Sequence, residues 1–236
     1  MKILWIAPIM GFEDAEIEKT GEYLRKFSFP ETEVVIRKVS RGTESVESLL
    51  DEAYATPPIL EEALRGEREG FDACIIGCAG DAGVLVAKEV LKIPVIGPGE
   101  ASILISQLIG KRIVILTTLP ERIPSLEDKV TRYISPNRFF IYPANTPVLE
   151  MRKDVARTVE ILTSIIQGSI EKDRADTAIL ACLSMLGMAE EIQQRVQIPV
   201  IDPAIAALEM AQAVVKMKLS QTKKAYPFPP EKKRFL

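Results

Sequence analysis

Two cysteines occupy matching places in two similar stretches of the sequence. Cys78 lies in "DACIIGCAGDAG" and Cys182 in "DTAILACLSMLG", so that each follows a short apolar run. A thiolate is both a base and a nucleophile. The chain contains no histidine, which excludes Ser-His-Asp triads, Cys-His dyads and histidine-ligated metals within one subunit. Proton transfer near neutral pH is left to cysteine, a shifted carboxylate, lysine, tyrosine or water.

Both cysteines are expected where a strand ends and a helix begins. Ligands of open α/β sheets bind beyond the carboxyl ends of the strands. Unpaired N–H groups and the dipole at a helix N-terminus stabilise a thiolate, and such positions lower the pKa of cysteine from about 8.5 to between about 3.5 and 7.5. We therefore expect Cys78 and Cys182 to supply a base or nucleophile at neutral pH.

A pair of such thiols suits the inversion of a carbon stereocentre. One thiolate removes the proton from one face of the carbon, and the other thiol returns a proton to the opposite face. Backbone N–H groups after each cysteine would hold the enolate oxygen that forms between the two steps. A structural disulfide between Cys78 and Cys182 is the alternative, which a reducing compartment disfavours.

Two other features near Cys78 have simpler interpretations. Cys74 lies inside the same apolar run, about 13 Å from Cys78 in an extended strand, and is predicted to be a buried core thiol. The glycines of "GCAGDAG" match GxxGxxG, but a dinucleotide fingerprint follows the first strand of a fold, and the first strand here ends in "APIMG". These glycines are predicted to let backbone N–H groups approach a small ligand.

The elements that must position the cysteines alternate along the chain. Runs rich in valine, isoleucine and leucine are separated by segments with apolar residues at helical spacing, which is typical of βα units around a parallel sheet. Strands are expected at 2–7, 32–39, 73–77, 94–97, 112–118, 138–143, 177–181 and 199–202. Helices are expected at 14–27, 45–66, 82–91, 100–109, 120–134, 150–173, 186–195 and 204–219.

The second half of this pattern repeats the first. Cys78 and Cys182 are 104 positions apart, and "IPVIGP" at 93–98 returns 105 positions later as "IPVIDP" at 198–203. Generic similarity among doubly wound proteins is the alternative explanation, and the matched cysteines weigh against it. The fold class is therefore α/β, with two pseudo-symmetric lobes and the active site in the cleft between them.

Each lobe is expected to be a mainly parallel four-stranded sheet flanked by helices. The first lobe is assigned residues 1–98 and 208–236, which include the last helix and the tail, and the second lobe residues 99–207.

The composition limits partners and location. The 236 residues are 47% hydrophobic, enough for a packed core, and the net charge of −3 leaves no block suited to nucleic acid or a membrane surface. No apolar run approaches the ~18 residues of a membrane span, and the N-terminus lacks signal-peptide features, so we expect a cytoplasmic protein. The basic tail at 223–236 is read as a solvated extension rather than a binding arm, because prolines keep it from forming a helix.

Over nearly the whole chain the sequence resembles the hydantoin racemase family of the aspartate/glutamate/hydantoin racemase superfamily. "FDACIIGCAGDAG" is similar to the family's strand with a CxGDPG loop, and it is the most specific match. "IPVIGPGEAS", "RIVILTTLPERIPSLE", "ACLSMLGM" and "LSQTKKAYPFPPEK" resemble later family segments. The resemblance implies two α/β lobes with an interlobe active site, a homo-oligomer, a small-molecule substrate, and no metal or organic cofactor.

By the same resemblance Cys78 and Cys182 are the acid/base residues. The residues implied to bind the polar atoms of the substrate, or to border the same cleft, are Ala79, Gly80, Asp81, Thr117, Thr118, Leu183 and Ser184. For Asp81, three roles are open: it orients a thiol, binds substrate, or caps its own helix, where aspartate is favoured. Lys88 and Glu89 are read as exposed helix residues, so replacing Lys88 by alanine should leave turnover nearly unchanged.

The chain departs from the family at two places near the expected site. An Asn-Pro-Asn turn is typical after the first strand, where this chain has Ala7, Pro8 and Ile9. Glycines are typical around the second cysteine, where this chain has Ala181, Leu183 and Ser184. These changes remove polar groups near the expected ring and narrow the site, which alters the substrate more than the chemistry.

The sequence thus favours a cofactor-independent racemase acting on a 5-substituted hydantoin or a related ureide such as allantoin. Within the same fold, the competing function is another cysteine-dependent enolate enzyme, such as a maleate isomerase or an arylmalonate decarboxylase. From a different class, the competitor is a non-catalytic small-molecule binding protein, although binding alone does not require a thiol on both sides.

Overall fold

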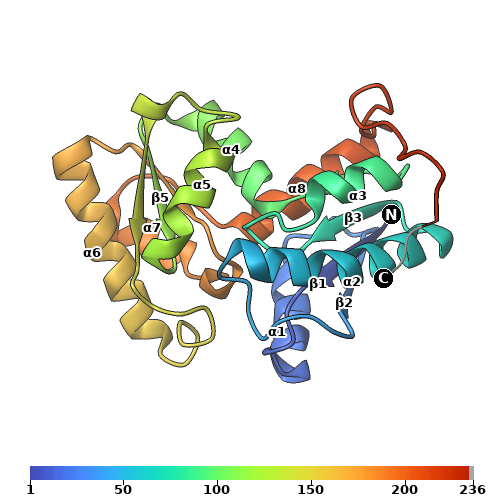
Figure 1. Cartoon of the computed structure of the whole chain (residues 1–236). Helices are drawn as coiled ribbons and strands as arrows, with labels where there is room; N and C mark the ends of the chain where they lie inside the picture. Colours follow the sequence, from blue (N-terminus) through green and yellow to red (C-terminus); the bar gives the residue numbers. More distant parts are fainter. Residues whose placement is uncertain (234–236) are drawn as a thin grey trace.

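The computed structural model describes residues 1–233 and contains two α/β lobes (Figure 1). The strands of the first lobe are β1 (Lys2–Ala7), β2 (Glu33–Lys38), β3 (Ala73–Ile76) and β4 (Val95–Ile96). Those of the second are β5 (Ile113–Thr117), β6 (Phe139–Pro143), β7 (Thr177–Leu180) and β8 (Val200–Ile201). The strand orders are β2-β1-β3-β4 and β6-β5-β7-β8, with every pair parallel. The predicted fold of two equivalent four-stranded lobes is confirmed.

The helices agree with the expected segments but differ at their ends. They are α1 (Asp14–Arg25), α2 (Leu49–Arg68), α3 (Val84–Val90), α4 (Pro98–Ile109), α5 (Ile123–Val130), α6 (Val155–Asp173), α7 (Ala189–Val196) and α8 (Pro203–Lys216). Among the described residues there are also three short 3₁₀ helices, η1 (Pro120–Arg122), η2 (Pro136–Arg138) and η3 (Leu183–Met185).

Capping residues explain two of these differences. Helix α2 begins four residues later than expected, because the Ser48 side chain accepts the N–H of Asp51 at 3.1 Å. Helix α6 begins five residues later than expected, because Asp154 accepts the N–H of Arg157 at 3.0 Å. Serine and aspartate satisfy otherwise unpaired N–H groups at a helix start in this way.

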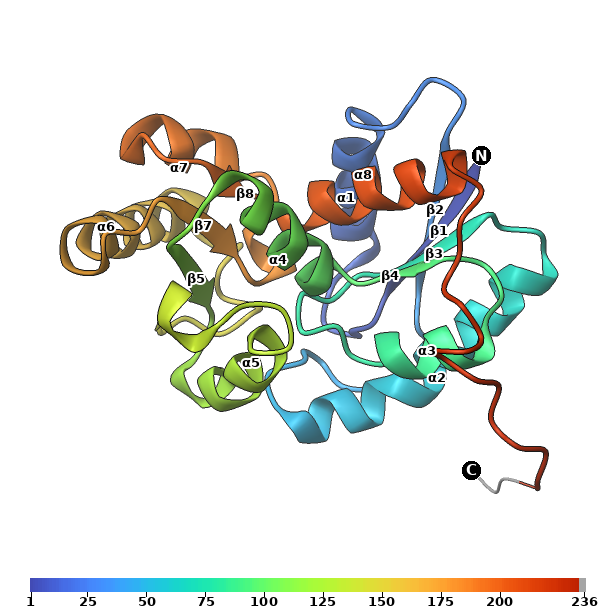
Figure 2. The ribbon, with the colours of Figure 1, turned by 90° about the horizontal axis from the view of Figure 1, so that it is seen from above.

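Helices α4 and α8 join the two lobes. Helix α4 follows the first sheet but contacts β7 of the second, whereas α8 follows the second sheet and contacts β3 and β4 of the first. The two helices pack against one another between the lobes (Figure 2). One hydrophobic cluster therefore draws on both sheets, with Trp5, Ile115 and Leu208 among its buried members. We propose the lobe boundaries given above, 1–98 with 208–236 and 99–207, and this packing of α8 supports them.

The start of the basic tail is not the free extension that the sequence indicated. The Nζ of Lys223 donates hydrogen bonds to the carbonyl oxygens of Lys88 at 2.8 Å and Glu89 at 2.9 Å, close to the end of α3. The side chain of Gln221 also bonds to the backbone on both sides of Lys92. Backbone acceptors near a helix end thus hold this segment against the first lobe. The end of the tail, 234–236, lies outside the described residues.

Candidate active site

Cys78 and Cys182 follow the equivalent strands of the two sheets. In the first lobe the N–H of Gly77 donates to the carbonyl of Ile6 at 2.7 Å, and in the second the N–H of Ala181 donates to the carbonyl of Leu116 at 2.8 Å. These matching bonds extend each strand pairing to the residue just before the cysteine. The two thiols therefore leave their sheets in the same way.

Both cysteines line one cavity between the lobes. Its volume is about 80 Å³, room for several water molecules, which fits a compact ligand. Six of the predicted substrate-binding residues also line it, namely Ala79, Gly80, Thr117, Thr118, Leu183 and Ser184. Ala7, Pro8 and Ile9, which replace the family's polar turn, form part of the same wall.

Asp81 is the predicted site residue that does not line this cavity. Its carboxylate accepts the N–H groups of Gly99 and Glu100, both at 2.8 Å. Asp81 thus caps a helix, but the helix is α4 rather than α3, which follows it in the chain. Its positive φ of 55°, a conformation that aspartate tolerates better than most residues, turns the loop toward α4.

The expected lowering of the cysteine pKa values is wrong. Burial raises the pKa of Cys78, and it raises that of Cys182 to about 11. The physical reason is that neither thiol sits on an α-helix N-terminus: α3 begins only at Val84, and Cys182 precedes a 3₁₀ helix of three residues. Desolvation of the thiolate therefore outweighs the local donors.

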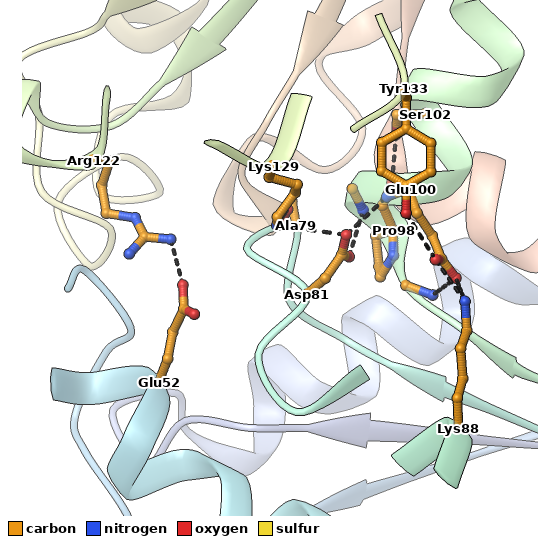
Figure 3. Close-up of polar contacts among 12 residues, drawn as sticks. Glu52, Ala79, Asp81, Lys88, Pro98, Glu100, Ser102, Arg122, Lys129 and Tyr133 are labelled. Carbon is orange, nitrogen blue, oxygen red and sulfur yellow. Dashed lines mark hydrogen bonds and ion pairs between the residues drawn. The ribbon is translucent and has the colours of Figure 1, made fainter. Parts of the chain in front are cut away.

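Two cations near Cys78 act on its pKa. The charges of Lys129 and Arg122 lower the pKa of the Cys78 thiol, whereas the carboxylate of Glu52 raises it. The Nζ of Lys129 donates to the carbonyl of Ala79 at 3.1 Å and lies 3.5 Å from the carboxylate of Asp81 (Figure 3). Helix α5 of the second lobe thus holds the Cys78 loop of the first.

The groups that lower the pKa of Cys182 are neutral. Its Sγ lies 2.9 Å from the Oγ of Ser184, and that hydroxyl also contacts the Sδ of Met151 at 3.1 Å. The hydroxyl has one hydrogen to donate, and it lowers the pKa of Cys182 by its hydrogen bond, as does the N–H of Ser184. The charges of Cys78 and Glu47 act in the opposite direction, so two thiolates disfavour one another.

Three charged residues of the cavity were not predicted. Arg122, Arg152 and Glu16 line it. Arg122 is the last residue of η1, just beyond the carboxyl end of β5, where ligands of α/β sheets bind, so its position in "TTLPERIP" is a signal that the sequence offers. Arg152 and Glu16 lie next to or within helices, and no pattern in the sequence connects them to the cysteines.

Lys88 is another residue whose environment differs from the prediction. It was read as exposed, but it is buried and its Nζ donates to both carboxylate oxygens of Glu100, at 2.7 and 2.6 Å (Figure 3). Glu100 also accepts the N–H of Gly97 at 3.1 Å. Glu89 is half-buried rather than exposed. The ion pair therefore connects α3 to the start of α4.

Other expected or alternative features can be compared with the described residues. The three cysteines are free thiols, and Cys74 is fully buried, so the disulfide alternative is not realised. Within residues 1–233, no group of three or more Cys, Asp or Glu side chains is arranged to hold a metal ion. In the same part of the chain, no helix combines the length and apolar character of a membrane span.

Comparison with solved structures matches nearly the whole chain to allantoin racemases. An allantoin racemase from Klebsiella pneumoniae superimposes with a TM-score of 0.90 and 28% identity, covering 98% of this chain and 94% of that chain. An allantoin racemase from Pseudomonas fluorescens gives the same TM-score and identity and covers both chains completely. A glutamate racemase from Francisella tularensis, at a TM-score of 0.65 and 18% identity, covering 94% of this chain and 83% of that chain, shares the fold.

Comparison of sequences gives the same answer. A hydantoin racemase from Paenarthrobacter aurescens is 32% identical over 236 residues, which cover 98% of this chain and 99% of that protein. A hydantoin racemase from Pseudomonas sp. (strain NS671) is 32% identical over 208 residues, which cover 87% of this chain and 83% of that protein. The family model described as Asp/Glu/Hydantoin racemase matches residues 15–211. The chain therefore belongs to the Asp/Glu/hydantoin racemase family.

Proposed function

We propose that this protein is a cofactor-independent racemase that inverts the stereocentre of a 5-substituted hydantoin or a related ureide such as allantoin. The observation that carries the proposal is that Cys78 and Cys182, from equivalent strand ends, line one cavity between the lobes. Binding alone does not explain a thiol at both places. The names of the similar proteins, hydantoin racemase and allantoin racemase, support this substrate class.

The proposed reaction uses one thiolate and one thiol. The thiolate takes the hydrogen of the stereocentre as a proton, and the C–H electron pair moves toward the neighbouring carbonyl to form an enolate. The opposite thiol then gives its proton to the other face of the same carbon. The reverse direction exchanges the two roles, so each cysteine is the base for one enantiomer.

The electrostatics of the cavity fit a pair of thiols that shares one proton. Burial raises the pKa of both thiols, and a charge on Cys78 raises that of Cys182 further. A doubly ionised pair is therefore disfavoured, while a single thiolate is stabilised by the nearby cations or hydroxyl. We expect activity to rise with pH as this thiolate forms, and to fall again when the second thiol ionises.

The cavity wall bears on the substituent of the ring. Ala7, Pro8, Ile9, Phe12 and Ile17 give one side of the cavity an apolar surface. Such a surface binds an apolar part of a substituent and offers few donors to a polar one. The hydantoin ring itself then lies at the cysteine loops, which supply backbone N–H groups.

The test is a panel of pure enantiomers followed by polarimetry. The panel holds 5-alkyl and 5-arylmethyl hydantoins and allantoin, with aspartate, maleate and an arylmalonate as competing substrates. We expect racemisation of at least one hydantoin or of allantoin without any added cofactor. The Cys78→Ser/Cys182→Ser double variant should have no activity, and Cys74→Ser, which changes a buried thiol outside the cavity, should retain it.

Two outcomes would overturn the proposal. Turnover of only maleate or the arylmalonate would make the protein a different enolate enzyme of this fold. Binding of a hydantoin without racemisation or loss of optical activity would make it a binding protein. The homo-oligomer and the cytoplasmic location implied above stay predictions.

A further inference from the structure

Arg122 carries a buried nitrogen that lacks a hydrogen-bond partner. Its side chain is nine-tenths buried and lines the cavity. One terminal nitrogen, Nη2, donates to the carboxylate of Glu52 at 2.7 Å, and the other, Nη1, has no partner among residues 1–233 (Figure 3). A buried charged donor without an acceptor is costly. Of the four such side-chain atoms in the described part of the chain, this is the one that belongs to a residue of the cavity.

The guanidinium of Arg122 is next to the thiol of Cys78. Gly80 separates them, and a Cβ built on Gly80 would lie 3.0 Å from Nη2 and 3.2 Å from Sγ. The absence of a side chain at Gly80 therefore allows the cation and the thiol to face the same small volume. The nitrogen next to this volume is Nη2, which is paired with Glu52, and Nη1 lies on the same guanidinium.

The other cations near the cysteines already have acceptors. Lys129 bonds to the carbonyl of Ala79 and pairs with Asp81. Arg152 points its Nη1 at the carbonyls of Ser184 and Leu186, both at 3.5 Å. Of these three cations, Arg122 is the one with a buried nitrogen that lacks an acceptor among residues 1–233. Because Glu52 offsets part of its charge, Nη1 suits a carbonyl oxygen that gains negative charge during the reaction better than a permanent carboxylate.

We propose that Arg122 is a catalytic residue whose Nη1–H donates to the substrate carbonyl beside the stereocentre and stabilises the enolate oxygen. The inference rests on the proposed racemase function and adds the group that receives the electron pair. When a thiolate breaks the C–H bond, the proton moves to sulfur and the electron pair moves to this oxygen. The pair returns to carbon when the opposite thiol gives up its proton, and Arg122 keeps its own protons throughout.

This role has a signature that differs from that of either cysteine. Both enantiomers pass through the same enolate, so loss of Arg122 must slow proton removal from both to a similar extent. Loss of one cysteine must instead affect the two enantiomers differently. Replacing a residue that only supports the Cys78 loop would also affect the two enantiomers differently, as replacing Cys78 does.

The experiment compares Arg122→Lys with Arg122→Met/Glu52→Gln. The lysine variant keeps a charge for Glu52 but lacks the second nitrogen, and the double variant removes both charges, so that no carboxylate is left buried alone. Removing one oxyanion donor lowers kcat by about 100- to 1000-fold. We expect such a fall in kcat in both variants with little change in KM. Exchange of the substrate α-hydrogen in D2O should slow equally for the two enantiomers, and added guanidinium should restore part of the activity of the double variant.

Arg41→Met is the matched control. Arg41 forms an exposed bidentate pair with Glu61, which lies on the same helix as Glu52, α2, but outside the cavity. Variants that retain kcat within about twofold, or that raise KM alone, would overturn the role of Arg122 while the wild-type activity upholds the racemase function. Unequal exchange of the two enantiomers would likewise overturn it. A wild-type protein that exchanges none of the hydantoins or allantoin would overturn the proposed function and this inference together.

Discussion

In each lobe a carboxylate connects the loop after the cysteine to the start of a helix, but the two lobes place this carboxylate differently. In the first lobe the fastening carboxylate is in the loop: Asp81 accepts N–H groups at the start of α4. In the second lobe it is on the helix: Asp202, the N-cap of α8, accepts the N–H of Ala204 at 2.9 Å and reaches back to the N–H of Gly187 at 2.8 Å. The connection between loop and helix is common to both lobes, whereas the residue that makes it is not.

The same contrast appears around the thiols. Cys78 is surrounded by charge, with Lys129, Arg122 and Glu52 all acting on its pKa. The pKa of Cys182 is lowered by the hydroxyl and N–H of one serine, and it is raised by the charges of Cys78 and Glu47. Pseudo-symmetry of the backbone thus places two equivalent thiols, and the side chains around them make the two thiols unequal. We expect Cys78 to respond to the removal of charge and Cys182 to the removal of a hydroxyl.

The largest expected effect tests whether both thiols are needed. Cys78→Ser and Cys182→Ser should each lower racemisation by at least about 100-fold, the lower range of general acid–base effects, because serine is too weakly acidic to replace a thiolate. In D2O each single variant should exchange the α-hydrogen of one enantiomer faster than that of the other, with opposite preferences, as followed by NMR. Identical preferences, or full racemisation by either variant, would rule out the two-cysteine mechanism.

A smaller effect concerns the charge beside Cys78. The positive charge of Lys129 lowers the pKa of Cys78, so Lys129→Met should raise it and leave less thiolate at neutral pH. A neighbouring opposite charge shifts a pKa by about 1 unit or more, so kcat/KM at pH 7 should fall about tenfold and recover as pH rises. The acidic limb of the pH–rate profile measures this. Lys129→Arg keeps the charge and should keep the profile, and an unshifted limb in Lys129→Met would contradict the assignment.

The comparison also shows what the sequence alone could and could not predict. The eight apolar runs and the constant offset between halves sufficed for the fold, because βα units leave a regular pattern. The same offset identified Cys78 and Cys182 as equivalent residues of the two halves. The pKa values were predicted wrongly because they depend on where each helix starts, and the left-handed turn at Asp81 that delays α3 leaves no signal in the residue types.

The sequence also could not predict the contacts between distant segments. Gly97 and Asp202 occupy equivalent places in "IPVIGP" and "IPVIDP", and the substitution looks neutral. In the structure a Cβ at Gly97 would lie 2.4 Å from the carboxylate of Asp81, so glycine is needed where the other lobe has its capping aspartate. Such an exchange of roles becomes visible only when loop and helix are seen together.

The hydroxyl beside Cys182 should have a more modest effect. Ser184→Ala removes the hydrogen bond that lowers the pKa of Cys182, so that pKa should rise. One hydrogen bond to a charged group is worth about 1.5 kcal/mol or more, about one pKa unit, and the retained N–H of Ser184 reduces this to a roughly three- to tenfold loss of reactivity. Alkylation of Cys182 against pH, in a Cys78→Ser background, measures it by mass spectrometry. Ser106→Ala removes a buried hydroxyl of α4 and should have no effect; equal alkylation rates with and without the Ser184 hydroxyl would argue against its role.

The smallest expected effect on turnover, and a clear one on stability, comes from the buried pair of Lys88 and Glu100. The equivalent positions of the second lobe, by the offsets of 104 and 105, are Ile192 and Ile205, so one lobe uses an ion pair where the other uses apolar side chains. Lys88→Ile alone leaves a buried carboxylate without its cation, which costs about 3 to 5 kcal/mol of unfolding free energy and lowers Tm by about 10 °C. Lys88→Ile/Glu100→Ile copies the second lobe and should recover most of that loss, since well-packed apolar residues replace buried ion pairs at little cost.

Neither change touches a thiol, so kcat should stay within about twofold wherever the variants are folded. Thermal unfolding of the wild type and both variants decides the matter: a double variant no more stable than the single one would mean that the two lobes are not interchangeable at this position.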